Sequence, residues 1–138
     1  MDRHERRIRV LLAEDHDLLR TALRELLTLQ ADLAVVAEAA DGLEAVRMAA
    51  AVAPDVVVMD VRLPCLDGPE ATRAIKASQP TTAVLALSAH SSRRVVDAML
   101  AAGACGYVPK SAAAAELAVA IRAAASGQTY ASPRLRDT

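Results

Sequence analysis

The stretch PDVVVMDVRLPCLDG, from Pro54 to Gly68, decides the fold. Its apolar run, Val56 to Met59, leads directly into Asp60. A short valine-rich run of this kind is typical of a strand that is buried on both faces of a sheet. Burying a carboxylate is costly unless it lies at an edge and meets a cation or a proton. The stretch therefore predicts a buried strand that presents Asp60 at the end of a sheet.

Apolar runs and helical patterns alternate on both sides of this strand. Further strands are predicted at residues 8–14, 33–39, 82–88 and 105–110, and helices at residues 17–30, 41–53, 69–78, 93–103 and 112–127. Alternating strands and helices form parallel sheets with helices on both faces, because parallel strands need crossover connections. We therefore expect an α/β domain with a doubly wound, five-stranded parallel sheet and five helices.

The bulk composition fits one domain and excludes several function classes. The chain has 138 residues, 54% of them hydrophobic, which is enough for one core. A net charge of −1 gives no electrostatic argument for direct binding to nucleic acid or to an anionic membrane. No apolar run approaches the ~18 residues of a membrane span. Cys65 and Cys105 lack the spacing of a metal site or a disulfide framework, so we expect a cytoplasmic protein.

Charged and polar side chains close four of the predicted strands. They are Glu14 with Asp15, Asp60, Ser88 and Lys110. Ligands of an open parallel sheet bind beyond the carboxyl ends of its strands, so these side chains are expected to converge. Carboxylates in such proximity raise one another's pKa unless a divalent cation neutralises them. A site of hard oxygen ligands suits Mg²⁺.

The remaining side chains of this group suit phosphoryl transfer. Lys110 adds a positive charge and Ser88 a small hydrogen-bond donor, and transfer of a phosphoryl group depends mainly on positioning and charge neutralisation. A carboxylate can accept the group as an aspartyl phosphate. Asp60 is therefore predicted to be a nucleophile beside a metal ion. His16 is interpreted as a solvated residue at a helix start, because nitrogen ligands suit zinc better than Mg²⁺.

At these residues the chain resembles the receiver domain of two-component response regulators, over residues 7–127. The resemblance rests on the acidic pair, the segment MDVRLPCLDG at 59–68, LSAH at 87–90 and GYVPK at 106–110. Three further segments resemble the NarL/FixJ-type subgroup: LLAEDH, VVAEAADGLEA and GQTYASPRL. The resemblance implies a flavodoxin-like (CheY-like) fold with strand order 2-1-3-4-5. Residues 128–138 are then the start of a linker to a helix-turn-helix output domain that this chain lacks.

The resemblance also implies a role for individual residues. Asp60 would be the phosphoacceptor. Mg²⁺, with Mn²⁺ as a substitute, would be held by Asp60, Asp15, the backbone carbonyl of Arg62 and, through water, Glu14. Ser88 and Lys110 would contact the phosphoryl group, Tyr107 would be an aromatic switch that turns inward, and Arg62 and His90 would tune the phosphoryl lifetime. Pro109 matches the cis-proline often found before this lysine, with the isomer left open. Glu14 stands where aspartate is more usual, and Cys65 where glycine is common.

The implied function is a phosphorylatable switch. A sensor histidine kinase would donate the phosphoryl group, and the shift in conformation would promote a homodimer and control DNA binding by the output domain. The domain would be no enzyme apart from Mg²⁺-dependent autophosphorylation and autodephosphorylation. A competing hypothesis is a phosphorylation-independent receiver that serves as an interaction module, which loss of the acidic pair or of Lys110 would have marked.

Two classes of enzyme are built on a related sheet, but neither fits the sequence. A nucleotide-binding oxidoreductase needs a glycine-rich fingerprint after the first strand, and the sequence has none there. An aspartate-nucleophile phosphatase needs a second aspartate two residues after the nucleophile, where Arg62 stands.

Overall fold

The central strand, β3 (Val56–Asp60), is buried along its whole length, as its valine run predicted. The sheet also contains β1 (Ile8–Ala13), β2 (Leu33–Ala39), β4 (Ala83–Ser88), β5 (Gly106–Pro109) and β6 (Tyr130–Ala131). The connecting helices are α1 (Asp17–Thr28), α2 (Gly42–Val52), α3 (Gly68–Ser78), α4 (Arg93–Ala102) and α5 (Ala113–Ala125), with a 3₁₀ turn, η2 (Lys110–Ala112), before α5. The structure, a computed structural model, describes residues 7–89 and 93–132.

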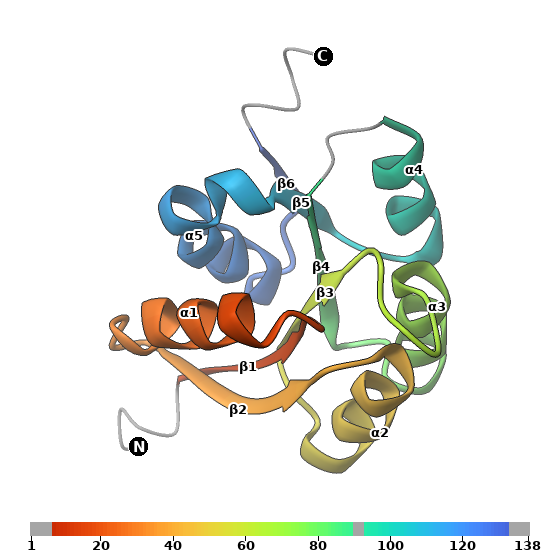
Figure 1. The fold of residues 1–138 in the computed structure, drawn as a ribbon, viewed down its shortest axis with the longest axis horizontal. Coiled ribbons are helices and arrows are strands. Elements are labelled where there is room, and N and C mark those ends of the chain that lie inside the picture. The colour runs from red at the N-terminus through yellow and green to blue at the C-terminus, as the bar shows by residue number, and fades with distance from the viewer. Residues whose placement is uncertain (1–6, 90–92, 133–138) are drawn as a thin grey trace.

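The strands are all parallel, in the order β2-β1-β3-β4-β5-β6. The helices cover both faces of this sheet (Figure 1). On one face α1 and α5 pack leucine and isoleucine side chains against the strands, among them Leu27 and Ile121. On the other face α2, α3 and α4 enclose a second core, which includes Ile75 and Met99. The predicted doubly wound α/β fold and the order of its first five strands are confirmed.

The polar site of this fold lies where the chain changes faces. After β1 the chain enters α1 on one face, and after β3 it enters α3 on the other (Figure 1). The loops that follow these neighbouring strands therefore diverge and leave a crevice between them. Glu14, Asp15 and Asp60 lie at this point, as the sequence predicted.

The sixth strand was not expected from the sequence, in which residues 128 onward looked like a linker. Tyr130 pairs with Gly106 and Ala131 with Tyr107. A Cβ atom on Gly106 would lie 2.6 Å from the Tyr130 carbonyl oxygen, so glycine permits the close approach of β6. The Tyr130 hydroxyl also donates a hydrogen bond to Glu116 of α5 at 2.7 Å. A two-residue strand is too short to show an alternating pattern, and the sequence therefore did not reveal it.

The peptide bond before Pro109 is trans, as are all other peptide bonds of the described residues. The resemblance matched a position where a cis-proline is often found, but the sequence left the isomer open. Pro109 ends β5 opposite Ser88 in an extended conformation, with φ −66° and ψ 143°. X–Pro bonds in general favour trans by about 0.5–1 kcal/mol.

The end of α2 carries backbone strain at Ala53, which has a φ of 46°. A left-handed conformation costs a residue with a Cβ atom about 1–2 kcal/mol. We expect Ala53→Gly to raise the free energy of unfolding by about 0.5–1 kcal/mol in urea denaturation. The control is Ala50→Gly at an exposed position within α2, which should lower it by about 1 kcal/mol. Destabilisation by both substitutions would contradict this prediction.

Candidate functional site

Asp60 is the last residue of β3, and its side chain is only 5% exposed. The backbone N–H of Arg62 donates a hydrogen bond to Oδ1 at 3.2 Å, and Lys110 Nζ donates one to Oδ2 at 2.9 Å. Burial raises the pKa of Asp60, the Lys110 hydrogen bond opposes this rise, and the Glu14 charge adds to it, so that the pKa reaches about 6. A carboxylate with a raised pKa is a stronger base and a better nucleophile than an ordinary aspartate.

Lys110 joins two buried carboxylates. Its Nζ lies 2.8 Å from Glu14 Oε1 and 2.9 Å from Asp60 Oδ2. Burial lowers the pKa of Lys110, but the hydrogen bonds to Asp60 and Glu14 outweigh this effect and raise it. The sequence predicted that the carboxylate at the end of β3 meets a cation or a proton, and in the structure the Lys110 ammonium contacts it at 2.9 Å.

The acidic pair follows β1, and its two side chains differ in environment. Glu14 is 1% exposed, whereas Asp15 faces solvent. The backbone N–H of His16 donates a hydrogen bond to Glu14 Oε2 at 3.0 Å. Burial raises the pKa of Glu14, but Lys110 and the His16 N–H outweigh it and lower the pKa below its ordinary value. Glu14 is therefore a fixed negative charge at neutral pH.

The acidic pair fits a hard divalent cation. Carboxylate oxygens of Glu14 and Asp15 lie within 4.8 Å of each other and of a ring nitrogen of His16. Glu14 Oε1 is buried, and among the described residues its polar contact is the Lys110 ammonium at 2.8 Å. A buried carboxylate beside a solvent-facing one suits Mg²⁺, which binds oxygen ligands and retains water.

A cleft of about 220 Å³ opens over Asp60. It is lined by Asp15, His16, Asp60, Arg62, Ser88, Ala89 and Lys110, which come from the ends of four strands. The structure thus brings Asp15, Asp60, Ser88 and Lys110 to one cleft, as predicted, and Lys110 connects it to Glu14. His90, predicted to tune the site, lies outside the described residues.

Tyr107 is turned into the domain and does not line this cleft. Its side chain is 1% exposed and belongs to the core under α3 and α4. A hydrogen bond joins Tyr107 to Ser88, which lies at the end of β4 and lines the cleft. Burial raises the pKa of the Tyr107 hydroxyl, and this hydrogen bond offsets part of the rise. The core aromatic is therefore in direct contact with a hydroxyl of the site.

The loop after β3 is held close to Asp60 by Gly68. The Gly68 N–H donates a hydrogen bond to the Val61 carbonyl at 2.9 Å. A Cβ atom on Gly68 would lie 2.5 Å from the Asp60 carbonyl oxygen. Only glycine therefore allows the start of α3 to pack this tightly against the end of β3.

Cys65, in the same loop, stands where the sequence resemblance expected glycine, and it has a φ of 69°. The side chain is exposed, so the cost of this conformation is not offset by burial. We expect Cys65→Gly to raise the free energy of unfolding by about 0.5–1 kcal/mol in urea denaturation. Cys65→Ala keeps the Cβ atom and is the matched control. A gain from alanine equal to that from glycine would show that the thiol, and not the backbone, causes the strain.

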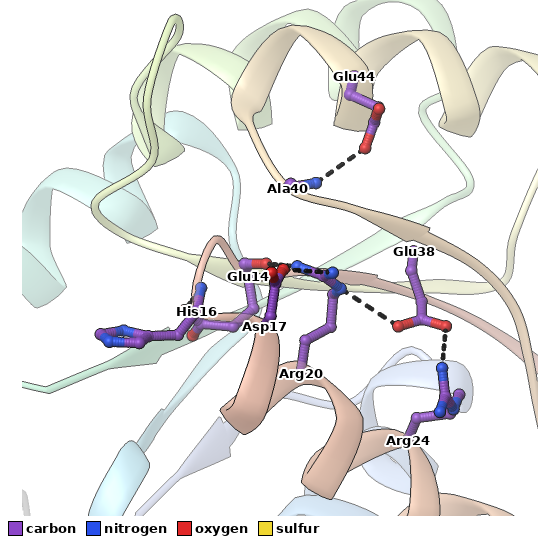
Figure 2. Close-up of polar contacts among 8 residues, drawn as sticks. All are labelled: Glu14, His16, Asp17, Arg20, Arg24, Glu38, Ala40 and Glu44. Atoms are coloured by element: carbon purple, nitrogen blue, oxygen red, sulfur yellow. Dashed lines mark hydrogen bonds and ion pairs between the residues drawn. The ribbon is translucent and has the colours of Figure 1, made fainter.

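One residue next to the site was missed by the sequence analysis. Arg20 of α1 donates a hydrogen bond from Nη1 to the Glu14 carbonyl at 2.7 Å (Figure 2). The sequence shows Arg20 only as a polar position in an amphipathic helix, and no motif links it to the acidic pair.

The chain matches the family described as the response regulator receiver domain over residues 10–122. It therefore belongs to the receiver domains of two-component response regulators, which are signalling domains and not enzymes in the ordinary sense. Its relatives are response regulators of the NarL/FixJ type, so the resemblance seen in the sequence is confirmed.

Two curated relatives illustrate the similarity. The response regulator GacA of Pseudomonas viridiflava is 41% identical over 93% of this chain and 60% of its own length. The transcriptional regulatory protein LiaR of Bacillus subtilis (strain 168) is 40% identical over 88% of this chain and 57% of its own length. The chain thus spans less than two thirds of these relatives.

Solved structures agree in fold over nearly the whole chain. A two-component response regulator of the LuxR family from Aurantimonas sp. SI85-9A1 has a TM-score of 0.89 and 39% identity, covering 95% of this chain and 94% of that one. The signal receiver domain of the putative response regulator NarL from Mycobacterium tuberculosis has a TM-score of 0.85 and 34% identity, covering 88% and 98%. Within residues 7–89 and 93–132, no helix is long and apolar enough to cross a membrane.

Proposed function

We propose that this receiver accepts a phosphoryl group on Asp60 from a sensor histidine kinase. The observation that carries the proposal is the placement of Asp60, a buried strand-end carboxylate with a raised pKa, which opens onto a cleft and is bridged by Lys110 to a second carboxylate. A carboxylate oxygen of Asp60 would form the new bond to phosphorus. The bond from phosphorus to the donor imidazole nitrogen breaks, and the electron pair stays on that nitrogen.

The side chains around the cleft have distinct roles in this proposal. Lys110 would exchange its contact with Asp60 Oδ2 for a phosphoryl oxygen, because the charge of that carboxylate is lost in the acyl phosphate. The Ser88 hydroxyl would donate a hydrogen bond to a second phosphoryl oxygen. Arg62, which lines the cleft, would tune access of water to the acyl phosphate and hence its lifetime. We propose the same role for His90.

The acidic pair would hold the metal ion. The carboxylates of Asp15 and Asp60 and the carbonyl of Arg62 would bind Mg²⁺, or Mn²⁺ in its place, with Glu14 acting through water. When bound, the ion neutralises the negative charge of the phosphoryl oxygens. We further propose slow, Mg²⁺-dependent autophosphorylation of Asp60 from small donors and later autodephosphorylation.

Phosphorylation would be read out through Tyr107. Its hydrogen bond with Ser88 makes its inward position sensitive to any movement of that hydroxyl. A phosphoryl group that draws Ser88 toward the cleft would therefore bias the position of Tyr107 and the surface formed by α4, β5 and α5.

We propose that an apolar groove beside the cleft is the docking site of a helical protein partner. The groove has a volume of about 490 Å³ and shares His16, Ala89 and Lys110 with the cleft over Asp60. Leu18 lines it and is 83% exposed, a large exposure for leucine. A histidine kinase that placed its phosphohistidine over Asp60 would cover this groove with an apolar helix face.

In a longer protein, the domain would control a transcriptional output. This proposal follows from relatives that are named transcriptional regulators and that extend beyond the matched region. We propose a receiver at residues 7–127, to which β6 is added, with the following residues leading to a helix-turn-helix domain that binds DNA, and a homodimer as the active form. We also propose a cytoplasmic location, in keeping with the free thiols of Cys65 and Cys105.

The test is the intact mass of the protein after incubation with acetyl phosphate. One added phosphoryl group is expected with Mg²⁺ and none with EDTA. Size-exclusion chromatography with light scattering on the same samples then shows whether the phosphorylated form dimerises. Addition of phosphoryl groups that is independent of Mg²⁺ would contradict the proposed mechanism. If none is added in Mg²⁺ from acetyl phosphate or from a phosphorylated histidine kinase, the hypothesis of an interaction module replaces it.

A further inference from the structure

We infer that Arg20 is a positioning residue that fixes the acidic pair for divalent cation binding, an inference that rests on the proposed metal site. Figure 2 shows its guanidinium between the end of β1, the first turn of α1 and β2. Nη1 donates to the Glu14 carbonyl at 2.7 Å, Nη2 to Asp17 at 2.8 Å and Nε to Glu38 at 3.2 Å. Each guanidinium nitrogen thus binds an acceptor from a different segment.

The contact with the Glu14 carbonyl matters because the chain leaves the sheet at this residue. The Glu14 N–H still donates to the Ala39 carbonyl of β2, at 3.0 Å. The Glu14 carbonyl belongs to the next peptide unit, which leads into Asp15 and follows the last residue of β1. Arg20 holds the oxygen of this peptide, so it fixes the plane from which the Asp15 side chain departs. Asp15 itself is exposed, and packing contributes little to its orientation.

The arrangement requires arginine rather than a simple positive charge. The guanidinium is planar and offers donors in several fixed directions, whereas lysine has a single ammonium group on a flexible stem. The Arg20 side chain is only 18% exposed. Its ion pair with Asp17 involves a carboxylate that is 87% exposed, so this pair contributes little stability. The directed hydrogen bond to the Glu14 carbonyl is then the contact that bears on the site.

Charge and geometry predict opposite effects of removing Arg20. A positive charge close to a cation site repels the cation, so charge alone predicts that Arg20→Met binds Mg²⁺ more tightly. Loss of positioning predicts weaker binding, because residues that orient metal ligands typically change affinity by about 10- to 100-fold. Arg24 provides a matched control. It pairs with Glu38 at 2.9 Å, as Arg20 does, but the structure gives it no contact with the acidic pair (Figure 2).

The experiment measures the Mg²⁺ dissociation constant by isothermal titration calorimetry for the wild-type chain, Arg20→Lys, Arg20→Met and Arg24→Met. We expect about 10-fold weaker binding in both Arg20 variants and wild-type or tighter binding in Arg24→Met. Amide hydrogen exchange by NMR, without metal, gives a second readout. The His16 N–H, which donates to Glu14 Oε2, is expected to exchange faster in the Arg20 variants and at the wild-type rate in Arg24→Met.

Three results would overturn the inference. Mg²⁺ binding in Arg20→Met that is as tight as in the wild type, or tighter, would show that charge and not positioning prevails. Equal weakening in Arg24→Met would show that the whole cluster around Glu38, and not the Glu14 contact, is responsible. Absence of Mg²⁺ binding in the wild type would overturn the proposed metal site together with this inference. If Arg20→Met does not fold, the test rests on Arg20→Lys, which keeps the charge. Mg²⁺ binding in Arg20→Lys as tight as in the wild type would then overturn the inference.

Discussion

Replacing Lys110 with methionine is expected to lower the free energy of unfolding by about 2–4 kcal/mol at pH 7.5 in EDTA. Lys110 is the cation that bridges Glu14 Oε1 and Asp60 Oδ2. The side chain of Glu14 is only 1% exposed and that of Asp60 only 5%. Without it, two buried negative charges face each other with no compensating cation. The measurement is urea denaturation, and the same variant should fail to hold the acyl phosphate in its signalling geometry.

Two comparisons isolate the charge effect in Lys110→Met. Mg²⁺ should restore part of the lost stability, because a bound divalent cation would neutralise the carboxylates that lose their pairing with Lys110. Lys110→Arg retains the positive charge and should lose less stability than methionine does. If Lys110→Met is as stable as Lys110→Arg in EDTA, the ion pairs of Lys110 contribute nothing to stability. That result would contradict the role of Lys110 as the cation that compensates Glu14 and Asp60.

Asp60→Asn is expected to raise the free energy of unfolding by about 1–2 kcal/mol at pH 7.5 in EDTA while abolishing phosphorylation. The folded-state pKa of Asp60 is about 6, above its ordinary value of 3.8. The folded protein therefore binds this proton more tightly than the unfolded chain. The stability that Asp60 contributes is fully present below its ordinary pKa and is lost as the pH rises through about 6. Asparagine cannot ionise, so the variant avoids this loss.

The pH dependence is the decisive feature of this prediction. The difference between Asp60→Asn and the wild type should be largest above pH ~6.5 and should disappear toward pH ~4, as thermal unfolding across that range will show. Asp67→Asn is the control, because Asp67 lies in the loop that follows β3 but is exposed and makes no side-chain cap hydrogen bond to α3. A stability gain in Asp60→Asn that is the same at all pH values would contradict the assignment of the raised pKa to Asp60.

Much of the fold was predictable because the decisive residues are local in sequence. The valine run of β3, the leucine spacing of α1 and the helix cap at Asp41 each specify one element from a few neighbouring residues. The Glu44 N–H donates to Asp41 Oδ1 at 2.7 Å, so Asp41 caps the start of α2. β6 was not predicted because its two residues show no pattern. It is held by residues distant in sequence: Gly106 permits its close approach, and Glu116 accepts the hydrogen bond from Tyr130.

The membership of the site was likewise predictable, but its internal contacts were not. Strand ends converge in any open parallel sheet, so Asp60, Ser88 and Lys110 could be grouped from sequence alone. The bridge from Lys110 to Glu14 depends on side-chain conformations that no spacing encodes. The same applies to Arg20, whose acceptor is a backbone carbonyl and has no sequence signature. The resemblance implied that Tyr107 turns inward, but its hydrogen bond with Ser88 had to be seen in the structure.

The most direct test of the account is to locate the phosphoryl group. Borohydride reduces an aspartyl phosphate to homoserine, and mass spectrometry of peptides then gives the position. After incubation with acetyl phosphate and Mg²⁺, we predict homoserine at position 60 and at no other aspartate. Homoserine at Asp15, or a phosphate ester on Ser88, would contradict the claim that the strand-end carboxylate of β3 is the phosphoacceptor.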